Sequence, residues 1–313
     1  MNPARPSRRV ILALAGLGLA RPAFAERTVT LRLLLGAPRG TGADRWARGF
    51  APFLERHWPR SSVTLINQPG EGGLVAARAM AETAADGKTI GLAAVPALVA
   101  RAVERSATEL LDRLDFVASI TEEPVVLVAP PGTDLAQLRA RHGKLIGCPP
   151  PGSAGQLLAD DLAGQLRLTP LSFPNAATAR QAVLAGNLAA ALLLLPDVIS
   201  ALREDRITAL AIGSSERSSL LPDVPRFEEL GLPRALATWR GCMLPPGVPA
   251  EMRDKLMTSL RAVVADPEFT AQGNETGFRP RFMPGTEWVA ALGGLRESLT
   301  ARWQRSPWIA RPD

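Results

Sequence analysis

Two glycine-rich loops carry the residues best suited to bind a ligand in this 313-residue chain. The first loop, residues 38–42, reads Pro-Arg-Gly-Thr-Gly, and the second loop, residues 67–73, reads Asn-Gln-Pro-Gly-Glu-Gly-Gly. Glycine lets the backbone approach a ligand closely, and a loop that leads into a helix presents free N–H groups at the positive end of the helix dipole. The chemistry that these loops favour is therefore the binding of an anion.

The motifs of covalent catalysis and nucleotide binding are incomplete. Residues 87–89 end like a phosphate-binding P-loop, but Glu82 stands where its first glycine belongs. Residues 152–155 lack the leading glycine of a nucleophile elbow, because Pro151 occupies that place. Neither of the two histidines has a partner at metal-ligand spacing, and the chain has no tyrosine. We therefore expect no catalytic residue, no metal site and no cofactor.

The elements that must position these loops alternate between strands and helices. Leucine-rich and β-branched runs predict strands, and glycine-rich turns and helix-forming stretches follow them. In the first half, the expected order is strand 29–35, helix 44–57, strand 62–66, helix 74–84 and strand 89–94. This βαβαβ order predicts a parallel sheet covered on both faces, and such sheets bind ligands at the carboxyl ends of their strands.

A second set of strand-like runs predicts another α/β unit. The expected strands are residues 125–129, 144–148, 189–195, 207–212 and 236–244, and the expected helices are 154–166, 249–265, 285–303 and one that starts near 197. The chain is too long for one core of ordinary size, which predicts two domains. We expect one domain from residues 26–124 together with 236–313, and a second from residues 125–235.

The N-terminus has the pattern of an export signal. Residues 1–9 hold three arginines and no acid, residues 10–20 are apolar or small, and residues 23–25 read Ala-Phe-Ala, a cleavage pattern. The apolar stretch is about half the length that a membrane span needs. Arg8 and Arg9 fit a twin-arginine signal as well as an ordinary secretory signal. We expect a periplasmic protein whose mature chain starts near Glu26.

Charge gives no reason to expect nucleic acid or an anionic membrane surface as a partner. The formal net charge is +6, but residues 1–25 contribute four arginines and no acid, which leaves +2 for the rest. The two cysteines, Cys148 and Cys242, are compatible with a disulfide after export or with two free thiols.

Six strings, in order, resemble the solute receptors of tripartite tricarboxylate transporters, which are also called Bug-family periplasmic binding proteins. They are the first loop with Asp44 and Arg48, the second loop, and residues 84–89, 143–155, 221–233 and 239–249. The resemblance covers essentially the whole mature chain. It implies an α/β, two-domain periplasmic binding protein of the type II-like, hinge-closing kind, with a ligand cleft between the lobes.

The resemblance also implies a small organic carboxylate as the ligand, held by backbone N–H groups and ordered water. The residues that match the family's site are Pro38, Arg39, Gly40, Thr41, Asp44, Asn67, Gly70, Glu71, Gly72, Gly73 and Ser153. Membrane transporter subunits are the implied partners, and we expect a monomer.

Two of these positions depart from the family's pattern. Glu71 stands where the family has alanine, and Arg39 stands where a small residue or proline is common. A glutamate in the cleft would repel a carboxylate or pair with a ligand amine, and Arg39 could neutralise it. Either the two side chains pair at the mouth of the cleft, or both point to solvent.

Two classes of function fit these observations. Ligand capture for transport is the leading hypothesis, and a receptor that reports to a sensor kinase would share all of its features. An exported enzyme would need Ser153, Cys148 or Asp44 as its reactive group, and none of these has a visible partner base. We therefore expect a receptor that does no covalent chemistry on its ligand.

Overall fold

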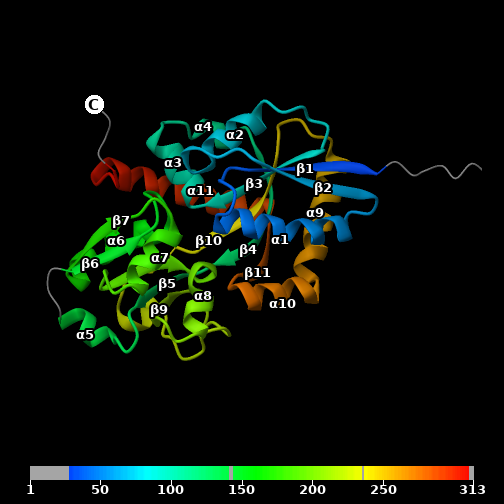
Figure 1. The fold of residues 1–313 in the computed structure, drawn as a ribbon. Helices are drawn as coiled ribbons and strands as arrows, with labels where there is room; N and C mark the ends of the chain where they lie inside the picture. The colour runs from blue at the N-terminus through cyan, green and yellow to red at the C-terminus, as the bar shows by residue number, and fades with distance from the viewer. Residues whose placement is uncertain (1–27, 141–143, 235, 310–313) are drawn as a thin grey trace, which may run out of the picture.

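The computed structural model describes residues 28–140, 144–234 and 236–309, which form two β-sheets flanked by helices (Figure 1). The expected export signal in residues 1–25, the expected start at Glu26 and the second histidine, His142, lie outside the described residues. We call the parts of the chain built around the two sheets the first lobe and the second lobe. The second lobe is green to yellow in Figure 1.

The first lobe holds a six-stranded sheet in the order β11-β4-β10-β3-β1-β2. Its strands are β1 (Val29–Leu35), β2 (Ser61–Asn67), β3 (Thr89–Val95), β4 (Asp115–Glu123), β10 (Thr238–Leu244) and β11 (Arg279–Pro284). β1 pairs in parallel with β2 and β3, whereas β10 runs antiparallel to both β3 and β4, and β11 antiparallel to β4. The parallel arrangement predicted for the βαβαβ run is confirmed for β1, β2 and β3. The whole sheet is mixed, because the chain returns from the second lobe in the opposite direction and inserts β10 between β3 and β4.

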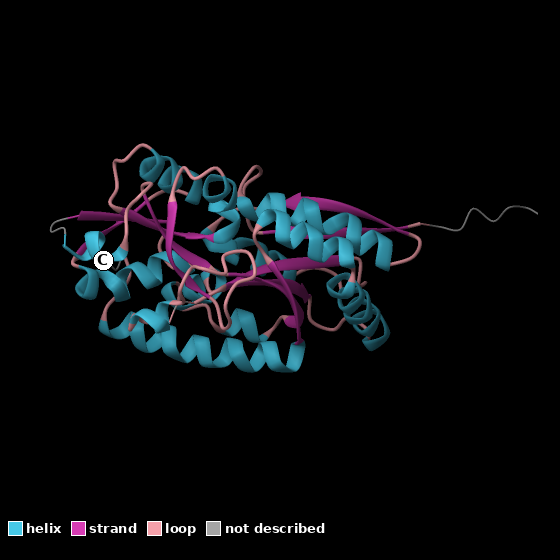
Figure 2. Cartoon of the chain, turned by 90° about the horizontal axis from the view of Figure 1, so that it is seen from below, coloured by secondary structure: helices cyan, strands magenta, loops and turns pink. Residues whose placement is uncertain are grey.

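Helices cover both faces of this sheet (Figure 2). They are α1 (Gly42–His57), α2 (Leu74–Ala81), α3 (Ala97–Glu104), α4 (Glu109–Asp112), α9 (Ala250–Ala265), α10 (Pro267–Thr276) and α11 (Gly285–Arg305). Alternate strand residues point to opposite faces, so Leu31 and Leu33 pack with α1 and α9 while Leu34 packs with α2, α3 and α11.

The second lobe holds a five-stranded sheet in the order β7-β6-β8-β5-β9. Its strands are β5 (Val125–Ala129), β6 (Lys144–Cys148), β7 (Leu168–Ser172), β8 (Ala190–Leu194) and β9 (Thr208–Gly213). Its helices are α5 (Leu135–Ala140), α6 (Ala154–Leu166), α7 (Ala176–Leu184) and α8 (Leu195–Arg203). β6 pairs in parallel with β7 and β8, so the loops that follow β6 and β8 lie at the same edge of the sheet.

The chain passes between the lobes twice, from β4 to β5 at Pro124 and from β9 to β10. We propose that the two domains divide at these passages, between residues 124 and 125 and between residues 235 and 236, as expected from the sequence. The last turns of α11 make a further connection, because Arg302 donates to the Leu157 carbonyl at 2.8 Å and pairs with Asp160 and Asp161 on α6.

Cys148 and Cys242 are buried, free thiols in β6 and β10, one in each sheet. Of the two alternatives left open by the sequence, the structure therefore contains the free thiols. Burial raises the pKa of Cys148 to about 11 and raises the pKa of Cys242 further. Both thiols stay protonated at neutral pH.

Candidate functional site

The two glycine-rich loops meet at the carboxyl edge of the first sheet, where β1 and β2 end side by side. Gln68 N–H donates to the Leu35 carbonyl at 2.8 Å. A Cβ placed on Gly36 would lie 2.4 Å from the Cα of Gly73, so the two backbones touch there and only glycine fits at position 36. The sequence prediction that strand ends position both loops at one place agrees with this geometry.

The Asp44 carboxylate holds the first loop in shape from within. It accepts a hydrogen bond from the Gly40 N–H at 2.9 Å and one each from Nε and Nη2 of Arg48 at 3.0 Å. Asp44 is only 3% exposed. The hydrogen bond from Arg48 is the main cause that lowers the pKa of Asp44 to about 2, and burial acts in the opposite direction. With these partners, Asp44 orders the loop and has little acceptor capacity left for a ligand.

Asn67 ties the second loop to the first. Its amide nitrogen donates to Asp44 Oδ1 at 2.9 Å and to the Ala37 carbonyl at 2.9 Å, and its oxygen accepts from Arg48 at 3.3 Å. Both amide hydrogens are therefore used within the protein. Asn67 positions the backbone around the site, and the structure gives it no spare donor for a ligand.

The start of α1 provides the anion-binding groups. Helix α1 begins at Gly42 rather than at the expected Asp44, because Thr41 is the N-cap and its hydroxyl accepts the Asp44 N–H at 3.4 Å. Within residues 28–140, 144–234 and 236–309, no acceptor is recorded for the N–H groups of Gly42 and Ala43. Free N–H groups at the positive end of a 16-residue helix attract a carboxylate.

The remaining predicted residues of the first loop contribute differently. The Pro38 carbonyl accepts the Thr41 hydroxyl at 2.8 Å, and the Gly40 carbonyl accepts from Arg45 at 2.9 Å. Arg39 is exposed on this loop. These bonds fix the curvature of the loop, which aims the α1 N-terminus toward the second lobe.

The first alternative, a Glu71–Arg39 pair, is wrong, because Glu71 pairs with other arginines of the described chain. Arg39 is exposed, as the second alternative expects, whereas Glu71 is only partly exposed. Glu71 adopts a left-handed backbone, with φ of 47°, in the short turn Glu71–Gly73 between Gly70 and α2. This turn directs its carboxylate along α2 and toward the end of α3, where it pairs with Arg78 at 2.6 Å and Arg105 at 3.4 Å. The glycines at 70, 72 and 73 all have positive φ, which only glycine adopts freely.

Ser153 lies at the matching edge of the second sheet. It is the N-cap of α6, and its hydroxyl accepts the Gln156 N–H at 3.3 Å. The loop before it packs on the first lobe: a Cβ on Gly152 would lie 3.0 Å from the Ala100 side chain, and Arg101 donates to the Pro151 carbonyl at 3.4 Å. Ser153 is thus close to the boundary between the lobes, and its contact with a ligand stays a prediction.

Asp197, in the first turn of α8, faces the start of α1 from the second lobe. A Cβ on Gly42 would lie 3.1 Å from Asp197 Oδ1. Burial is the main cause that raises the pKa of Asp197 to about 6, and the nearby Glu123 carboxylate raises it further. The guanidinium groups of Arg240, Arg45 and Arg180 lower it.

A buried ion pair lies behind Asp197. Arg240 on β10 donates to both oxygens of Glu123 on β4 at 2.6 and 2.7 Å, and the two residues are 6% and 1% exposed. The Arg240 guanidinium also lies over the Trp46 ring, 5.6 Å from its centre. This pair belongs to the strands that lead to and from the second lobe.

Sequence reasoning missed Gly42, Ala43 and Asp197 as site residues. Gly42 and Ala43 could have been found, because N–H groups that follow a Ser/Thr/Asp cap are the free ones of a helix. Asp197 gave no such signal, since an acid in the first turn of a helix is typical of helix stabilisation alone.

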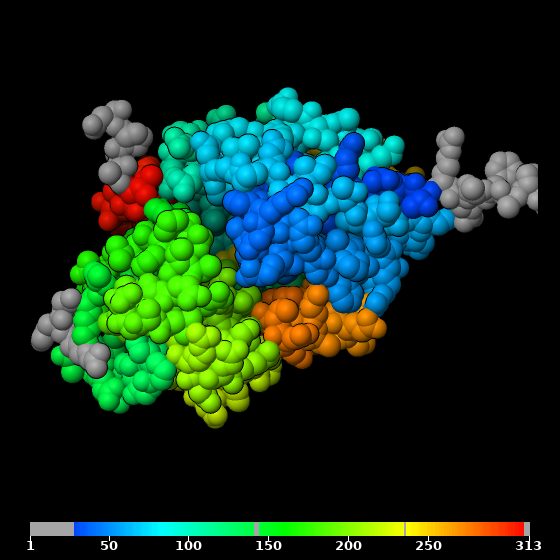
Figure 3. All heavy atoms as spheres, viewed as in Figure 1, coloured from blue at the N-terminus to red at the C-terminus, as the bar shows by residue number. Residues whose placement is uncertain are grey.

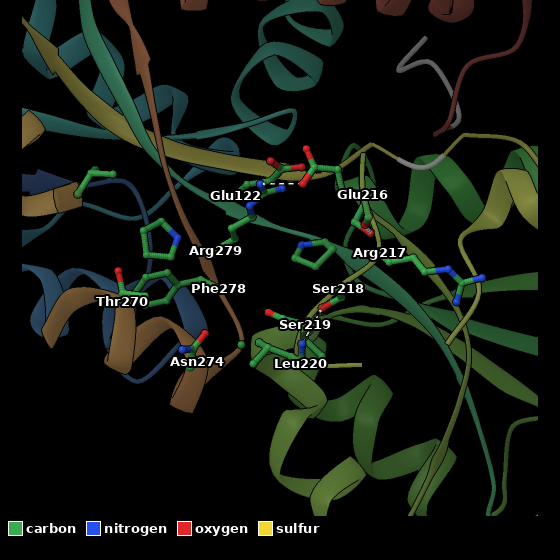
Figure 4. A pocket seen from close by; sticks show the side chains of 16 residues that line it. Glu122, Glu216, Arg217, Ser218, Ser219, Leu220, Thr270, Asn274, Phe278 and Arg279 are labelled. Carbon is green, nitrogen blue, oxygen red and sulfur yellow. Dashed lines mark hydrogen bonds and ion pairs between the residues drawn. The ribbon is translucent and has the colours of Figure 1, made fainter. Parts of the chain in front are cut away.

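A separate cavity of about 420 Å³ lies between the lobes near the start of β11 (Figure 4). It is lined by the loop that follows β9, including Glu216 and Ser218, and by Asn274, Phe278 and Arg279 of the first lobe. Arg279 pairs with Glu216 across it at 3.2 Å. Among the described residues that line it, none is a predicted site residue, so this cavity is distinct from the glycine-rich loops.

The described residues lack two further kinds of feature, a metal-binding cluster and a membrane-spanning helix. No group of three or more histidine, cysteine or acidic side chains is arranged to hold a metal ion among them. None of the helices in the described part of the chain combines the length and the apolar character that crossing a membrane requires.

A family model described as "Tripartite tricarboxylate transporter family receptor" matches residues 59–289. The chain belongs to this family. Protein BugT of Bordetella pertussis is 28% identical over 293 residues, which cover 87% of this chain and 90% of BugT. The assignment made from the six sequence strings is thereby confirmed.

Solved structures of this kind share the fold. MatC of Rhodopseudomonas palustris with bound malate aligns with a TM-score of 0.72 at 24% identity, covering 88% of this chain and 98% of MatC. An R. palustris protein with adipate aligns with a TM-score of 0.73 at 22% identity, covering 88% and 95%. The two-domain periplasmic binding protein fold expected from the sequence is confirmed, and Figure 3 shows the second lobe of this family member lying against α1 and α10 of the first.

Proposed function

We propose that this family member is a periplasmic receptor that captures a small organic carboxylate between its lobes and delivers it to a tripartite tricarboxylate-type transporter in the membrane. One observation carries the proposal. The N–H groups of Gly42 and Ala43 have no recorded acceptor in the described chain, and they lie at the α1 N-terminus, where Gly42 faces Asp197 of the second lobe. Family membership supports the same function, and the malate and adipate named for two structural neighbours are both carboxylates.

The energetics of such a site are sufficient. Two or three charge-assisted hydrogen bonds of about 1.5–3 kcal/mol each, together with burial in the cleft, give affinities in the micromolar range. Asp44 and Asn67 hold the first and second loops before a ligand arrives. A preformed loop loses less conformational entropy on binding, which favours affinity.

Closure of the lobes is the proposed conformational step. The two strand passages, at Pro124 and between β9 and β10, are the natural points of bending. In the closed state, α8 and the Ser153 turn cover the carboxylate and exclude water from it. Lower local polarity strengthens the bonds to the α1 N-terminus, so the closed state is the one that a ligand selects.

We also propose that the cleft does no covalent chemistry. The three reactive groups considered from the sequence are each occupied or inactive: Cys148 has a pKa raised to about 11, Asp44 is bound by Arg48 and Asn67, and the Ser153 hydroxyl caps α6. A nucleophile needs an adjacent base or a lowered pKa.

A thermal-shift panel on the exported protein tests the ligand class. Mono-, di- and tricarboxylates would be compared with amines and sugars. A ligand present at about 100 times its dissociation constant adds roughly 2.7 kcal/mol to the free energy of unfolding, which raises the midpoint of thermal unfolding measurably. Stabilisation by sugars or amines alone would contradict the proposal.

A matched pair of variants at one position tests the site itself. Gly42→Pro removes one free N–H, at a helix position where proline is tolerated, and Gly42→Ala crowds Asp197 similarly but keeps the N–H. We expect Gly42→Pro to bind a stabilising carboxylate about 10-fold or more weakly than Gly42→Ala. Equal affinities would remove this N–H from the site.

A further inference from the structure

The Asp197 carboxylate is an acceptor without a donor. Within the described residues, no hydrogen bond to its side chain is recorded and no guanidinium group pairs with it. Its carboxylate faces Gly42 of the other lobe, where a Cβ added to the glycine would lie 3.1 Å from Oδ1. The side chain is partly buried, and burial is the main cause that raises the pKa of Asp197 to about 6.

The charged neighbours of Asp197 are each engaged elsewhere. Arg240 and Glu123 form a bidentate pair with one another. Arg180 on α7 donates to the backbone carbonyl of Asp197 at 2.7 Å, and Arg45 on α1 donates to a carbonyl of the first loop at 2.9 Å. A hydrogen-bond donor for the carboxylate must therefore come from outside the protein.

Donors and an acceptor without recorded partners lie close together where α1 and α8 face each other. The N–H groups of Gly42 and Ala43 have no recorded acceptor, and the Asp197 carboxylate, which faces Gly42, has no recorded donor among the described residues. A carboxylate whose neighbouring carbon carries an ammonium or hydroxyl group presents an acceptor and a donor one carbon apart. An unsubstituted carboxylate would satisfy the N–H groups and would face Asp197 with like charge.

We propose that Asp197 is a specificity-determining residue of the cleft, which accepts a hydrogen bond from an ammonium or hydroxyl group on the carbon next to the carboxylate of the ligand. The ligand class is then the α-amino or α-hydroxy carboxylates. This inference rests on the proposed function, because it presumes that the carboxylate binds at the α1 N-terminus.

Isothermal titration with three sets of matched compounds tests it. The sets are aspartate, malate and succinate; glutamate, 2-hydroxyglutarate and glutarate; and citrate with tricarballylate. In at least one set, we expect the amino or hydroxy member to bind the wild-type protein about 10-fold more tightly than the unsubstituted member. The ammonium and the hydroxyl arms identify which donor the site uses.

Variants of Asp197 test whether this residue causes the preference for the amino or hydroxy ligand over the unsubstituted one. Asp197→Ala removes both acceptor oxygens, whereas the amide oxygen of an asparagine would still accept a hydrogen bond. Asp197→Leu serves the same purpose if the first variant does not fold. We expect the preference to fall to about 3-fold or less, whereas Asp205→Asn, an exposed carboxylate just beyond α8, keeps it.

The outcomes separate the two proposals. An unsubstituted member that binds wild type as tightly as its partners in every set would overturn the role of Asp197 and leave carboxylate capture standing. A preference that survives Asp197→Ala would overturn it too. Binding by none of the eight compounds, nor by any other carboxylate in the thermal-shift panel, would remove the proposed function and this inference with it.

Discussion

Glu123 and Arg240 join the two strands that carry the chain between the lobes. Their bidentate bond, 2.6 and 2.7 Å long, links the last residue of β4 to β10, next to the passage at Pro124. Both side chains are almost completely buried. A buried pair of this kind is weak evidence for net stability, but the loss of one partner leaves an uncompensated charge in the interior.

The first prediction therefore concerns Glu123→Gln. We expect it to lower the free energy of unfolding by about 3 kcal/mol, measured by urea denaturation, because Arg240 keeps its charge without a counter-ion. Glu204→Gln is the matched control, since its pair with Arg206 is more than half exposed and should matter by less than about 0.5 kcal/mol. Equal effects of the two changes would contradict the prediction.

The lowered pKa of Asp44 predicts that the free energy of unfolding decreases in strong acid. Its pKa is lowered from 3.8 to about 2 in the folded protein, so its contribution is present above pH 3.8 and is lost as the pH falls through 2. We expect Asp44→Asn to cost about 2 kcal/mol at pH 7 and little at pH 2, by denaturant titration at both pH values. A loss that is independent of pH would indicate packing damage instead.

Asp197 gives the opposite dependence on pH. Its pKa is raised from 3.8 to about 6, so its stabilising contribution is complete below pH 3.8 and is lost as the pH rises through 6. We expect the ligand-free wild type to lose at most about 3 kcal/mol relative to Asp197→Asn between pH 4 and pH 7.5. Parallel midpoint-against-pH curves for the two proteins would show that the carboxylate is well solvated.

The side chains of Glu71 and Arg39 should not affect the affinity for the ligand. Glu71 pairs with Arg78 and Arg105 on the outside of α2 and α3, and Arg39 is exposed. We expect the double change Arg39→Ala with Glu71→Ala to leave the dissociation constant of a stabilising carboxylate within about 2-fold, with a stability cost below about 1 kcal/mol. A larger change in affinity, measured by calorimetry, would show that these side chains take part in ligand binding.

The sequence predicts the parts of this molecule that depend on local chemistry. Glycine-rich turns after apolar runs locate both loops and the edge of the sheet where they meet. Strand β4 was missed, because it ends in Glu122 and Glu123, and acids are rare in buried strands. Arg281 and Arg240 neutralise them from β11 and β10, more than a hundred residues later in the chain.

The place of β10 in the sheet was not predicted. A single sequence shows the run of residues 238–244 but not the partners that it finds, so its antiparallel insertion was invisible. The role inferred for Asp197 depends in the same way on a contact between two lobes, with Gly42. Residue type and spacing along the chain carry no information about which residues of the two lobes lie close together.

The insertion of β10 also sets an order of assembly for the nascent chain. β10 lies between β3 and β4, yet it follows every strand of the second lobe in the sequence. The second lobe is continuous and has all its strands once β9 has emerged. Until β10 and β11 are synthesised, β3 has one unpaired edge and β4 has two, and unpaired strand edges promote aggregation. The lobe that holds the glycine-rich loops is therefore the last to become complete, and a chain cut before β10 would keep a finished second lobe beside an open sheet.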